Sequence, residues 1–346
     1  MPNIFELKIN AKNIKTIWEA KEPTLYVGEA FFPSTKQVGL DINLIKGKDD
    51  LPVALVSANW DTDVLYRDRI GFEALSAEMP YFKEAYKVSE KLRQQILQTK
   101  DGYVEPLFNQ VFKDVTNLVE GADVTAERLR MLLLGTGTIS IQENGVDKQY
   151  DYGFNTANQF KTEGTLWSAS GAKPFGSFVA QLKNYKKLTG KNAKYVIMNT
   201  DVFDKLASDP EVLGYFQALQ TPNLYPNDDD VRAYIEQKTK VRVIIADGEY
   251  IKARDFKNKT KVPFYPQDRY TIVATEDLGE TIYGTTPEEA DLLGDSSNAL
   301  SCQILNNGVA VTTWKEPDPV GVNTKVSEVV LPSCPEIENI YIVKVL

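Results

Sequence analysis

The sequence predicts an α+β fold, and three observations lead to that prediction. Period-2 patterns typical of strands and 3.6-residue patterns typical of helices both occur along the 346 residues. The two kinds of segment do not alternate regularly, as they would in a doubly wound sheet or a barrel. The chain also has no internal repeat, no low-complexity tract and no obvious flexible linker. This length is sufficient for two or three domains with a sizeable core.

Composition excludes several classes of function. The net charge is -9, from 39 basic and 48 acidic residues. An acidic chain is poorly suited to binding nucleic-acid phosphates or an anionic membrane surface, because both carry negative charge. No apolar run approaches the length of a membrane span. The chain has no histidine, which removes Ser-His-Asp hydrolases, Cys-His proteases and histidine-based metal sites. Cys302 and Cys334 have no CxxC spacing, so we expect buried free thiols in a reducing compartment.

The first clear strand pattern predicts a long hairpin. Four apolar residues alternate with polar ones and give the strand one apolar face: Val38, Leu40, Ile42 and Leu44. The polar run 46–50 predicts a turn, and residues 51–56 are expected to form the return arm. Pro52 lies in that arm and favours an edge position, because proline lacks the N–H that a central strand needs. A two-stranded unit is barely stable alone, so we expect it to pack on its own domain or on a neighbouring chain.

Helical patterns flank this hairpin. Ile14, Ile17 and Trp18 could share one face of a helix, so residues 1–22 form either a short helix or an extended arm. A capping signal at Ser76 predicts a helix over 76–99, and a second helix is expected over 106–134 with an interruption at Gly121. Gly135 is expected to end that second helix as its C-cap.

The remaining elements mix strands and helices. Residues 139–150 predict a hairpin that turns at 143–145. Helices are expected over 177–188, from the cap at 199–201 through 206, and from 231 onward. Strands are expected over 194–198, 241–245, 270–274, 309–314, 326–331 and 340–345. The apolar strand at the C-terminus should be tied into a sheet.

Motifs that suggest site chemistry have simpler structural explanations. The aspartates of Asn59–Asp63 lack the glycine and glutamate of a calcium loop, so turn or cap roles are favoured. The Gly135/Gly137 pair lacks the other residues of a phosphate loop. The run 228–230 precedes a helix, where capping and the helix dipole explain carboxylates better than a metal does. Glu288 and Glu289, or Asp61 and Asp63, could form an acid–base pair, but neither pair lies in a recognisable catalytic signature.

Short motifs spread over nearly the whole chain carry a family resemblance. In order they are Gly28-Glu-Ala-Phe-Phe-Pro33 with Gly39-Leu-Asp41, Arg69-Ile-Gly-Phe72, Leu132-Leu-Leu-Leu-Gly-Thr-Gly137, Asn144-Gly-Val146, Asp151-Tyr-Gly153, Gly279-Glu-Thr-Ile-Tyr-Gly-Thr-Thr-Pro-Glu-Glu-Ala290, and the ending Asp318-Pro319, Val329-Val-Leu-Pro332 and Pro335. With these motifs the chain resembles the major capsid proteins of tailed phages, of the lambda-type capsid protein E family, which have the Hong Kong 97 phage fold.

The resemblance implies a domain plan. It gives an N-terminal arm over 1–22 and an extended β-hairpin loop over 23–58. A peripheral domain with a long spine helix follows over 59–165 and is completed by 320–346, and an axial domain covers 166–319. Either of the two helices expected over 76–99 and 106–134 could be the spine.

The resemblance also implies self-assembly as hexamers and pentamers into an icosahedral head around double-stranded DNA, with no cofactor and no enzymatic activity. The implied partners are further copies of the chain, scaffolding and portal proteins and a decoration protein, with nonspecific contact to DNA and none to membranes. The implied location is the virion, assembled in the host bacterial cytoplasm. The residues expected to carry assembly lie in the extended loop: Lys36, Val38, Leu40, Ile42, Leu44, Lys46, Lys48, Asp49 and Asp50. A non-viral compartment shell with the same fold and a carboxylate-based enzyme are the alternatives.

Overall fold

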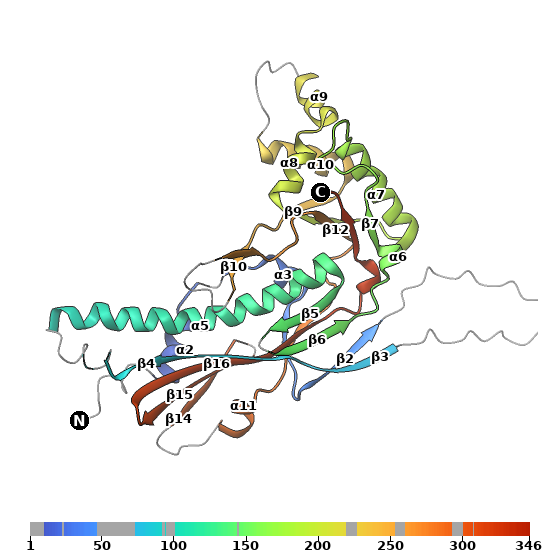
Figure 1. The fold of residues 1–346 in the computed structure, drawn as a ribbon. Coiled ribbons are helices and arrows are strands. Elements are labelled where there is room, and N and C mark those ends of the chain that lie inside the picture. Colours follow the sequence, from blue (N-terminus) through green and yellow to red (C-terminus); the bar gives the residue numbers. More distant parts are fainter. Residues whose placement is uncertain are drawn as a thin grey trace, which may run out of the picture. The chain divides into compact units, whose positions relative to one another are not determined.

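The computed structural model describes residues 10–22, 24–46, 73–91, 94, 101–143, 145–218, 227–252, 260–292, 300–306 and 308–346. The chain forms two compact units. Unit 1 consists of Met1–Asn43, Ser76–Arg130 and Glu280–Ser333, and unit 2 of Leu44–Leu75, Met131–Gly279 and Cys334–Leu346. Both units combine helices and strands, so the predicted α+β class is confirmed (Figure 1).

The two units do not coincide with the expected domain ranges. Residues 280–319, which were expected in the axial domain, belong to unit 1. Residues 131–165 and 334–346, which were expected in the peripheral domain, belong to unit 2. The C-terminal strand is tied into a sheet as predicted, but that sheet lies in unit 2.

Unit 1 is built on a sheet whose longest strand is β16 (Val320–Ser333). The strand order is β1-β13-β16-β15-β14, and β4 also pairs with β16. β1 runs parallel to β13, and the other pairs are antiparallel. The other strands are β1 (Ser34–Lys36), β4 (Tyr81–Val88), β13 (Glu280–Tyr283), β14 (Leu300–Leu305) and β15 (Val309–Pro317).

The prediction of a helix over 76–99 is wrong for residues 76–88. These residues form β4 and the end of β3 (Glu73–Glu78). The apolar residues of β4 that suggested a helix instead form part of a strand whose register on β16 pairs Phe82 with Glu328 and Tyr86 with Thr324. Pairing with a distant strand therefore overrides the local helical pattern.

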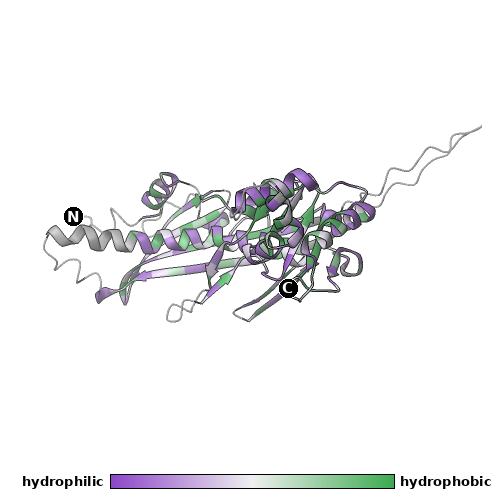
Figure 2. Cartoon of the chain, turned by 90° about the horizontal axis from the view of Figure 1, so that it is seen from above, coloured by the Kyte–Doolittle hydropathy of each residue, from purple (hydrophilic) through white to green (hydrophobic). Residues whose placement is uncertain are grey.

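A single helix, α5 (Asp101–Thr136), covers the second predicted helix without a break. Gly121 lies inside it, so the expected interruption is wrong. Where Figure 2 colours α5 by hydropathy, hydrophilic and hydrophobic residues alternate, as in a helix with one buried face. Unit 1 also contains α2 (Ala11–Glu19), which resolves the choice between helix and arm, together with α3 (Val27–Phe31) and α11 (Pro287–Leu292).

Gly137, rather than Gly135, ends α5. Gly137 has a positive φ of 74°, and its N–H donates to the carbonyl of Leu133 at 2.8 Å, which is the geometry of a left-handed C-cap. Gly135 remains helical, and a Cβ there would lie 2.5 Å from Cδ of Pro266. Close packing in unit 2 therefore accounts for Gly135.

Unit 2 contains a five-stranded sheet in the order β7-β17-β12-β8-β9. β7 and β9 are its edge strands, and β12 runs antiparallel to its two neighbours. The strands are β7 (Phe160–Thr162), β8 (Tyr195–Met198), β9 (Arg242–Ile245), β12 (Arg269–Val273) and β17 (Tyr341–Lys344). The helices are α6 (Thr156–Gln159), α7 (Pro174–Thr189), α8 (Thr200–Ala207), α9 (Pro210–Ala218) and α10 (Asp228–Thr239). Two hairpins complete it: β5 (Thr138–Glu143) with β6 (Val146–Asp151), and β10 (Glu249–Ile251) with β11 (Lys261–Pro263).

Most predicted elements of the second half of the chain are confirmed, and their caps explain where they begin. Oδ1 of Asn199 accepts from the N–H of Val202 at 3.2 Å, and Oδ1 of Asn227 accepts from the N–H of Asp230 at 2.7 Å. The carboxylates of 228–230 therefore occupy the first turn of α10, with Asn227 as the capping residue. The core between helices and sheet is aromatic: the ring of Tyr270 lies 5.5 Å from Trp167 and 5.6 Å from Phe178.

Candidate assembly site

The hairpin that the sequence singled out is formed by β2 (Asp41–Lys46) and β3 (Glu73–Glu78). Within the described ranges this two-stranded sheet pairs with no other strand, and Figure 1 shows its strands side by side. The strand prediction is confirmed for 41–44, and among the described residues the partner of this strand is β3, whereas the expected return arm was 51–56. That arm and the turn at 47–50 lie outside the described residues. The expected loop boundary at residue 58 falls between the two paired strands.

Backbone hydrogen bonds fix the point where this hairpin leaves unit 1, which we call the hairpin root (residues 36–42 and 79). The N–H of Thr285 donates to the carbonyl of Gly39 at 3.0 Å, and the N–H of Gly39 donates to Oγ1 of Thr285 at 3.1 Å. The N–H of Met79 donates to the carbonyl of Leu40 at 2.9 Å. Gly39 has a φ of 110°, a conformation that favours glycine. A Cβ on Gly284 would lie 2.7 Å from the carbonyl oxygen of Gly39, so the two segments touch at the backbone.

The expected assembly residues divide into different environments. Nζ of Lys36 lies 2.5 Å from Oε2 of Glu289 and donates to the carbonyl of Gly284 at 2.8 Å, so this lysine holds the root to α11. Ile42 is fully buried, whereas Val38 is 88% exposed and Leu40 49% exposed. Val38 and Leu40 precede β2 and lie in a bend.

The side chains of the other five expected residues lie outside the description. The backbones of Leu44 and Lys46 lie in β2, but their side chains are outside the description. Lys48, Asp49 and Asp50 are outside the described residues.

Glu288 and Glu289 do not form an acid–base pair, because they have different partners. Glu288 is buried and accepts from Nζ of Lys325, from the Tyr81 hydroxyl at 2.7 Å and from the Ser327 hydroxyl at 2.9 Å. Burial acts to raise the pKa of Glu288, but hydrogen bonds from Lys325 and Tyr81 outweigh it and lower the pKa to about 2. A carboxyl group with this pKa stays ionised and binds α11 to β4 and β16.

A second buried ion pair joins the segment before the root to α5. Nε of Arg130 donates to Oγ1 of Thr281 at 2.7 Å, and Nη2 donates to Oγ of Ser34 at 2.9 Å. Nη1 lies 3.5 Å from Oε2 of Glu127, whose Oε1 accepts from the N–H of Gly28 at 2.8 Å. Glu127 and Arg130 are both almost fully buried, so this network fixes α3 and β1 against the helix.

Sequence reasoning missed these network residues because their partners are distant in the chain. Lys36 and Glu289 are 253 positions apart, and Arg130 and Thr281 are 151 positions apart. Two features of the sequence could have pointed to this network: Glu127 and Arg130, a charged pair at i, i+3 within an apolar helix, and the glycine of the Gly28–Pro33 motif. Neither signal identifies the partner strand.

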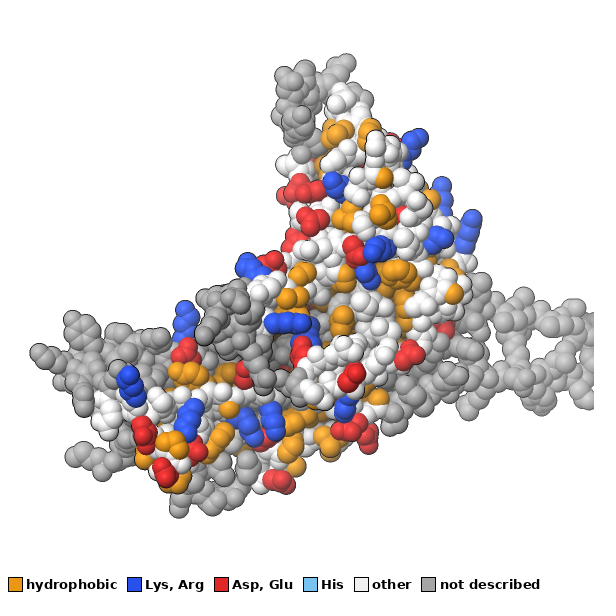
Figure 3. Space-filling view, in the orientation of Figure 1, with side chains coloured by type: hydrophobic (Ala, Val, Ile, Leu, Met, Phe, Trp, Pro, Cys, Tyr) orange, Lys and Arg blue, Asp and Glu red, His pale blue; other side chains and the backbone are white. Residues whose placement is uncertain are grey.

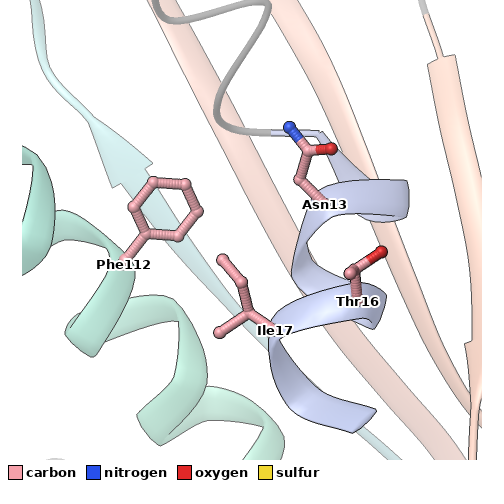
Figure 4. A pocket seen from close by; sticks show the side chains of 4 residues that line it. All are labelled: Asn13, Thr16, Ile17 and Phe112. Atoms are coloured by element: carbon pink, nitrogen blue, oxygen red, sulfur yellow. The ribbon is translucent and has the colours of Figure 1, made fainter. Parts of the chain in front are cut away.

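Two cavities lined by described residues, one in each unit, lack the features of an active site. In unit 1 a cavity of about 270 Å³ lies between α2 and α5, where the side chains of Ile17 and Phe112 face each other beside Asn13 and Thr16 (Figure 4). It has no charged lining. In unit 2 a cavity of about 210 Å³ lies at the start of α8, where Asp247 accepts from the N–H of Thr200 at 2.8 Å. That carboxylate is used as a helix cap.

Three further observations concern composition-based expectations. Cys334 is buried and Cys302 half-buried, and both are free thiols. In the described part of the chain, no cluster of three or more acidic or cysteine side chains is arranged to hold a metal ion. Among the described helices, none combines the length and hydropathy needed to cross a membrane.

Comparisons with known proteins agree on one group. The sequence profile of the phage major capsid protein E family matches residues 14–345. A search of curated proteins gave no match. Among solved structures, a protein described as the capsid protein of an E. coli CFT073 prophage has a TM-score of 0.60 at 14% identity, over 98% of this chain and 99% of that one. A phage-related protein from Bordetella bronchiseptica RB50 has a TM-score of 0.56 at 9% identity, over 97% of each chain.

Proposed function

The chain belongs to the phage major capsid protein E family, and we propose that its copies assemble as hexamers and pentamers into an icosahedral head around double-stranded DNA. The family identifies a structural capsid protein of a tailed phage, located in the virion, rather than an enzyme. The fold is the Hong Kong 97-like capsid fold that the resemblance implied. Of the alternatives, the family match favours the phage capsid over a non-viral compartment.

The β2–β3 hairpin is the observation that carries the assembly proposal. Its strands pair with each other and with no other described strand, and an isolated two-stranded ribbon is marginally stable in water. Its root, in contrast, is held by four short contacts involving Gly39, Leu40 and Lys36. A ribbon that is held firmly at its root and whose strands pair with no other described strand is suited to lie on an adjacent subunit.

Exposed apolar side chains at the root support the same interpretation. Of the predicted apolar stripe, Val38 and Leu40 are exposed, whereas Ile42 is buried. Isolated exposed apolar residues are common on proteins, but these two flank the glycine that sets the direction of the hairpin. We propose that they are covered when a neighbouring subunit packs against the root.

The proposed partners follow from this role. Further copies of the chain form the shell, and scaffolding and portal proteins direct its closure in the host cytoplasm, with a decoration protein added afterwards. The chain carries a net charge of -9, which favours weak, nonspecific contact with packaged DNA, because tight binding requires many cations facing phosphates.

Replacing the ribbon tests the proposal. In this variant residues 45–74 are replaced by an Asn-Gly turn, which favours a tight hairpin and leaves the root contacts in place. We expect a folded chain, checked by circular dichroism and thermal unfolding, that forms no shells by negative-stain microscopy. A matched control, Val146→Ser in the exposed β5–β6 hairpin, should still assemble. Shells formed by the shortened chain would contradict the proposal.

A further inference from the structure

Helix α7 presents a basic face that has no acidic partner among the residues that the structure describes. The side of α7 that carries Phe175, Phe178 and Tyr185 is buried in the core of unit 2. Lys183, Lys186 and Lys187 lie outside this stripe and are exposed.

At i, i+3 and i+4 these three ammonium groups are neighbours on one helix face, and like charges at these spacings repel. The α7 sequence contains no Asp or Glu at all. Within the described part of the chain, none of the three forms an ion pair.

The helix dipole explains only part of this face. Lys186 and Lys187 lie in the last turn of α7, where positive charge is favourable. Lys183 lies one turn earlier, and Lys173 occupies the N-cap, where positive charge is unfavourable. In an isolated subunit the repulsion between these lysine charges is not compensated, so we expect the face to contact an acidic surface of another molecule.

The opposite side of unit 2 carries a matching acidic face. Asp201 and Asp204 are exposed on α8, Asp228 is exposed in the first turn of α10, and Asp247 is exposed after β9. Burial, and then the charges of Asp228, Asp201 and Asp247, raise the pKa of Asp204, so these carboxylates are close enough to repel one another. Helix capping accounts for Asp201, Asp228 and Asp247, but Asp204 lies beyond the first turn.

The two faces lie on different sides of one helical layer, because α7, α8 and α10 all pack on the same face of the sheet, where the rings of Phe175 and Tyr234 lie 5.9 Å apart. α7 follows β7 and α10 precedes β9, and these are the two edge strands of the sheet. Figure 1 shows α7 along one side of unit 2 and α8 and α10 along the other. In Figure 3 blue side chains gather on the side of α7 and red ones on the side of α8 and α10.

Each face also has one exposed apolar side chain nearby. Leu188 at the end of α7 is 43% exposed. Tyr215 on α9 is 40% exposed, and its ring stacks at 4.2 Å on Tyr234 of α10. Leucine and tyrosine side chains that become buried supply an apolar centre within a charged rim, the usual plan of a protein interface.

We propose that the basic face of α7 binds the acidic face of α8 and α10 on a second copy of this chain. Because the two faces are different surfaces of one unit, the contact is head to tail, and such a contact closes a ring of subunits where the rotation from one copy to the next returns to the first. This inference rests on the proposed function and identifies a contact within its capsomers. Charge complementarity at such a contact would set the register and speed encounter between copies.

Charge exchange tests the inference with the full chain. The first variant carries Lys183→Glu, Lys186→Glu and Lys187→Glu, and the second carries Asp204→Lys and Asp228→Lys. Each should raise the protein concentration needed for ring and shell formation by about tenfold or more, since like charges then face each other. The variant that carries all five changes restores opposite charges and should assemble near the wild-type concentration.

Mixing the first and second variants gives an independent readout. In a mixture the two chains can alternate, and alternation closes in a ring of six but not in a ring of five. Native mass spectrometry should therefore detect mixed hexamers without pentamers. A control with Lys12→Glu, Lys113→Glu and Lys161→Glu, three exposed lysines outside α7, α8 and α10, makes the same change in net charge as the first variant and should assemble like the wild type.

The outcomes separate this inference from the proposed function. If the wild type never assembles, the proposed function fails. If the wild type assembles and the charge variants assemble equally well, the faces do not meet and the basic face serves another acidic partner, such as DNA. If the five-change variant folds by circular dichroism but fails to assemble, charge pairing between these faces is also contradicted. Replacing Lys186 and Lys187 by glutamine gives a milder variant that tests the same contact without charge reversal.

Discussion

Glu288 of α11 and Lys325 of β16 form an ion pair in which the carboxylate is almost fully buried. Tyr81 and Ser327 donate two further hydrogen bonds to the same carboxylate. The neighbouring residue Glu289 instead pairs with Lys36 at the hairpin root, where both side chains are partly exposed. Two adjacent glutamates thus connect one short helix to two different parts of unit 1.

The first prediction compares these two glutamates. Glu288→Gln should lower the free energy of unfolding by about 2 kcal/mol, because hydrogen bonds to a buried charged group are lost. Glu289→Gln should cost less than about 1 kcal/mol, since exposed ion pairs contribute little. Urea titration of both variants at pH 7 measures the difference. Equal losses would contradict the burial argument.

The same pair sets a pH dependence with a definite sign. The folded-state pKa of Glu288, about 2, lies below its ordinary value of 4.5, so its contribution to stability is complete above about pH 4.5 and is lost as the pH falls toward 2. The loss of stability between pH 4.5 and pH 2 should therefore be smaller for Glu288→Gln than for the wild type.

The second prediction concerns Glu328, a buried carboxyl group whose pKa is raised, whereas that of Glu288 is lowered. Neither oxygen of Glu328 has a hydrogen-bond partner among the described residues. Burial, followed by the charge of Asp123, raises its pKa well above the usual value. Burial and the charge of Glu29 raise the pKa of Asp123 to about 6. The folded chain therefore binds these protons more tightly than the unfolded chain, and stability falls as the pH rises above the ordinary carboxyl values.

Glu328→Gln removes one of these protonation sites. It should raise the free energy of unfolding at pH 8 by about 1 to 3 kcal/mol, with a smaller gain at pH 5. Glu280→Gln, at an exposed position, is the matched control and should leave the pH profile unchanged. A profile for Glu328→Gln that runs parallel to that of the wild type would contradict this account.

The third prediction uses two glycines of α5 and its cap. A Cβ on Gly121 would meet no atom within 4 Å, so Gly121→Ala should stabilise the chain by about 1 kcal/mol through helix propensity. Gly137 has a φ of 74°, and a Cβ there would lie 2.3 Å from Cγ of Phe154. Gly137→Ala should therefore lower the melting temperature. A lower melting temperature for Gly121→Ala would indicate that α5 is not continuous at this point.

Local signals predicted the elements whose structure is decided locally. Asn199 caps α8 as the sequence indicates, and the 36-residue helix α5 follows from its apolar spacing. Gly121 was misinterpreted because one glycine costs a long helix only about 1 kcal/mol. Packing along the rest of the helix compensates for a cost of that size.

Elements that depend on distant partners could not be predicted. β4 is a strand because it pairs along its length with β16, from Val322 opposite Val88 to Val329 opposite Tyr81. The described partner of β2 is likewise β3 (Glu73–Glu78), which lies far along the chain from the polar turn predicted at 46–50. The site contacts of Lys36 and Arg130 depend on the same long-range topology, and no spacing rule within the sequence encodes it.

Assembly of the purified chain tests the central claim most directly. Negative-stain electron microscopy of the wild-type protein, alone and with a scaffolding partner, should show rings of subunits or closed shells. The variant in which an Asn-Gly turn replaces residues 45–74 should show neither, although it remains folded. A wild-type chain that stays monomeric under every condition would contradict the account, as would a shortened chain that assembles as well as the wild type.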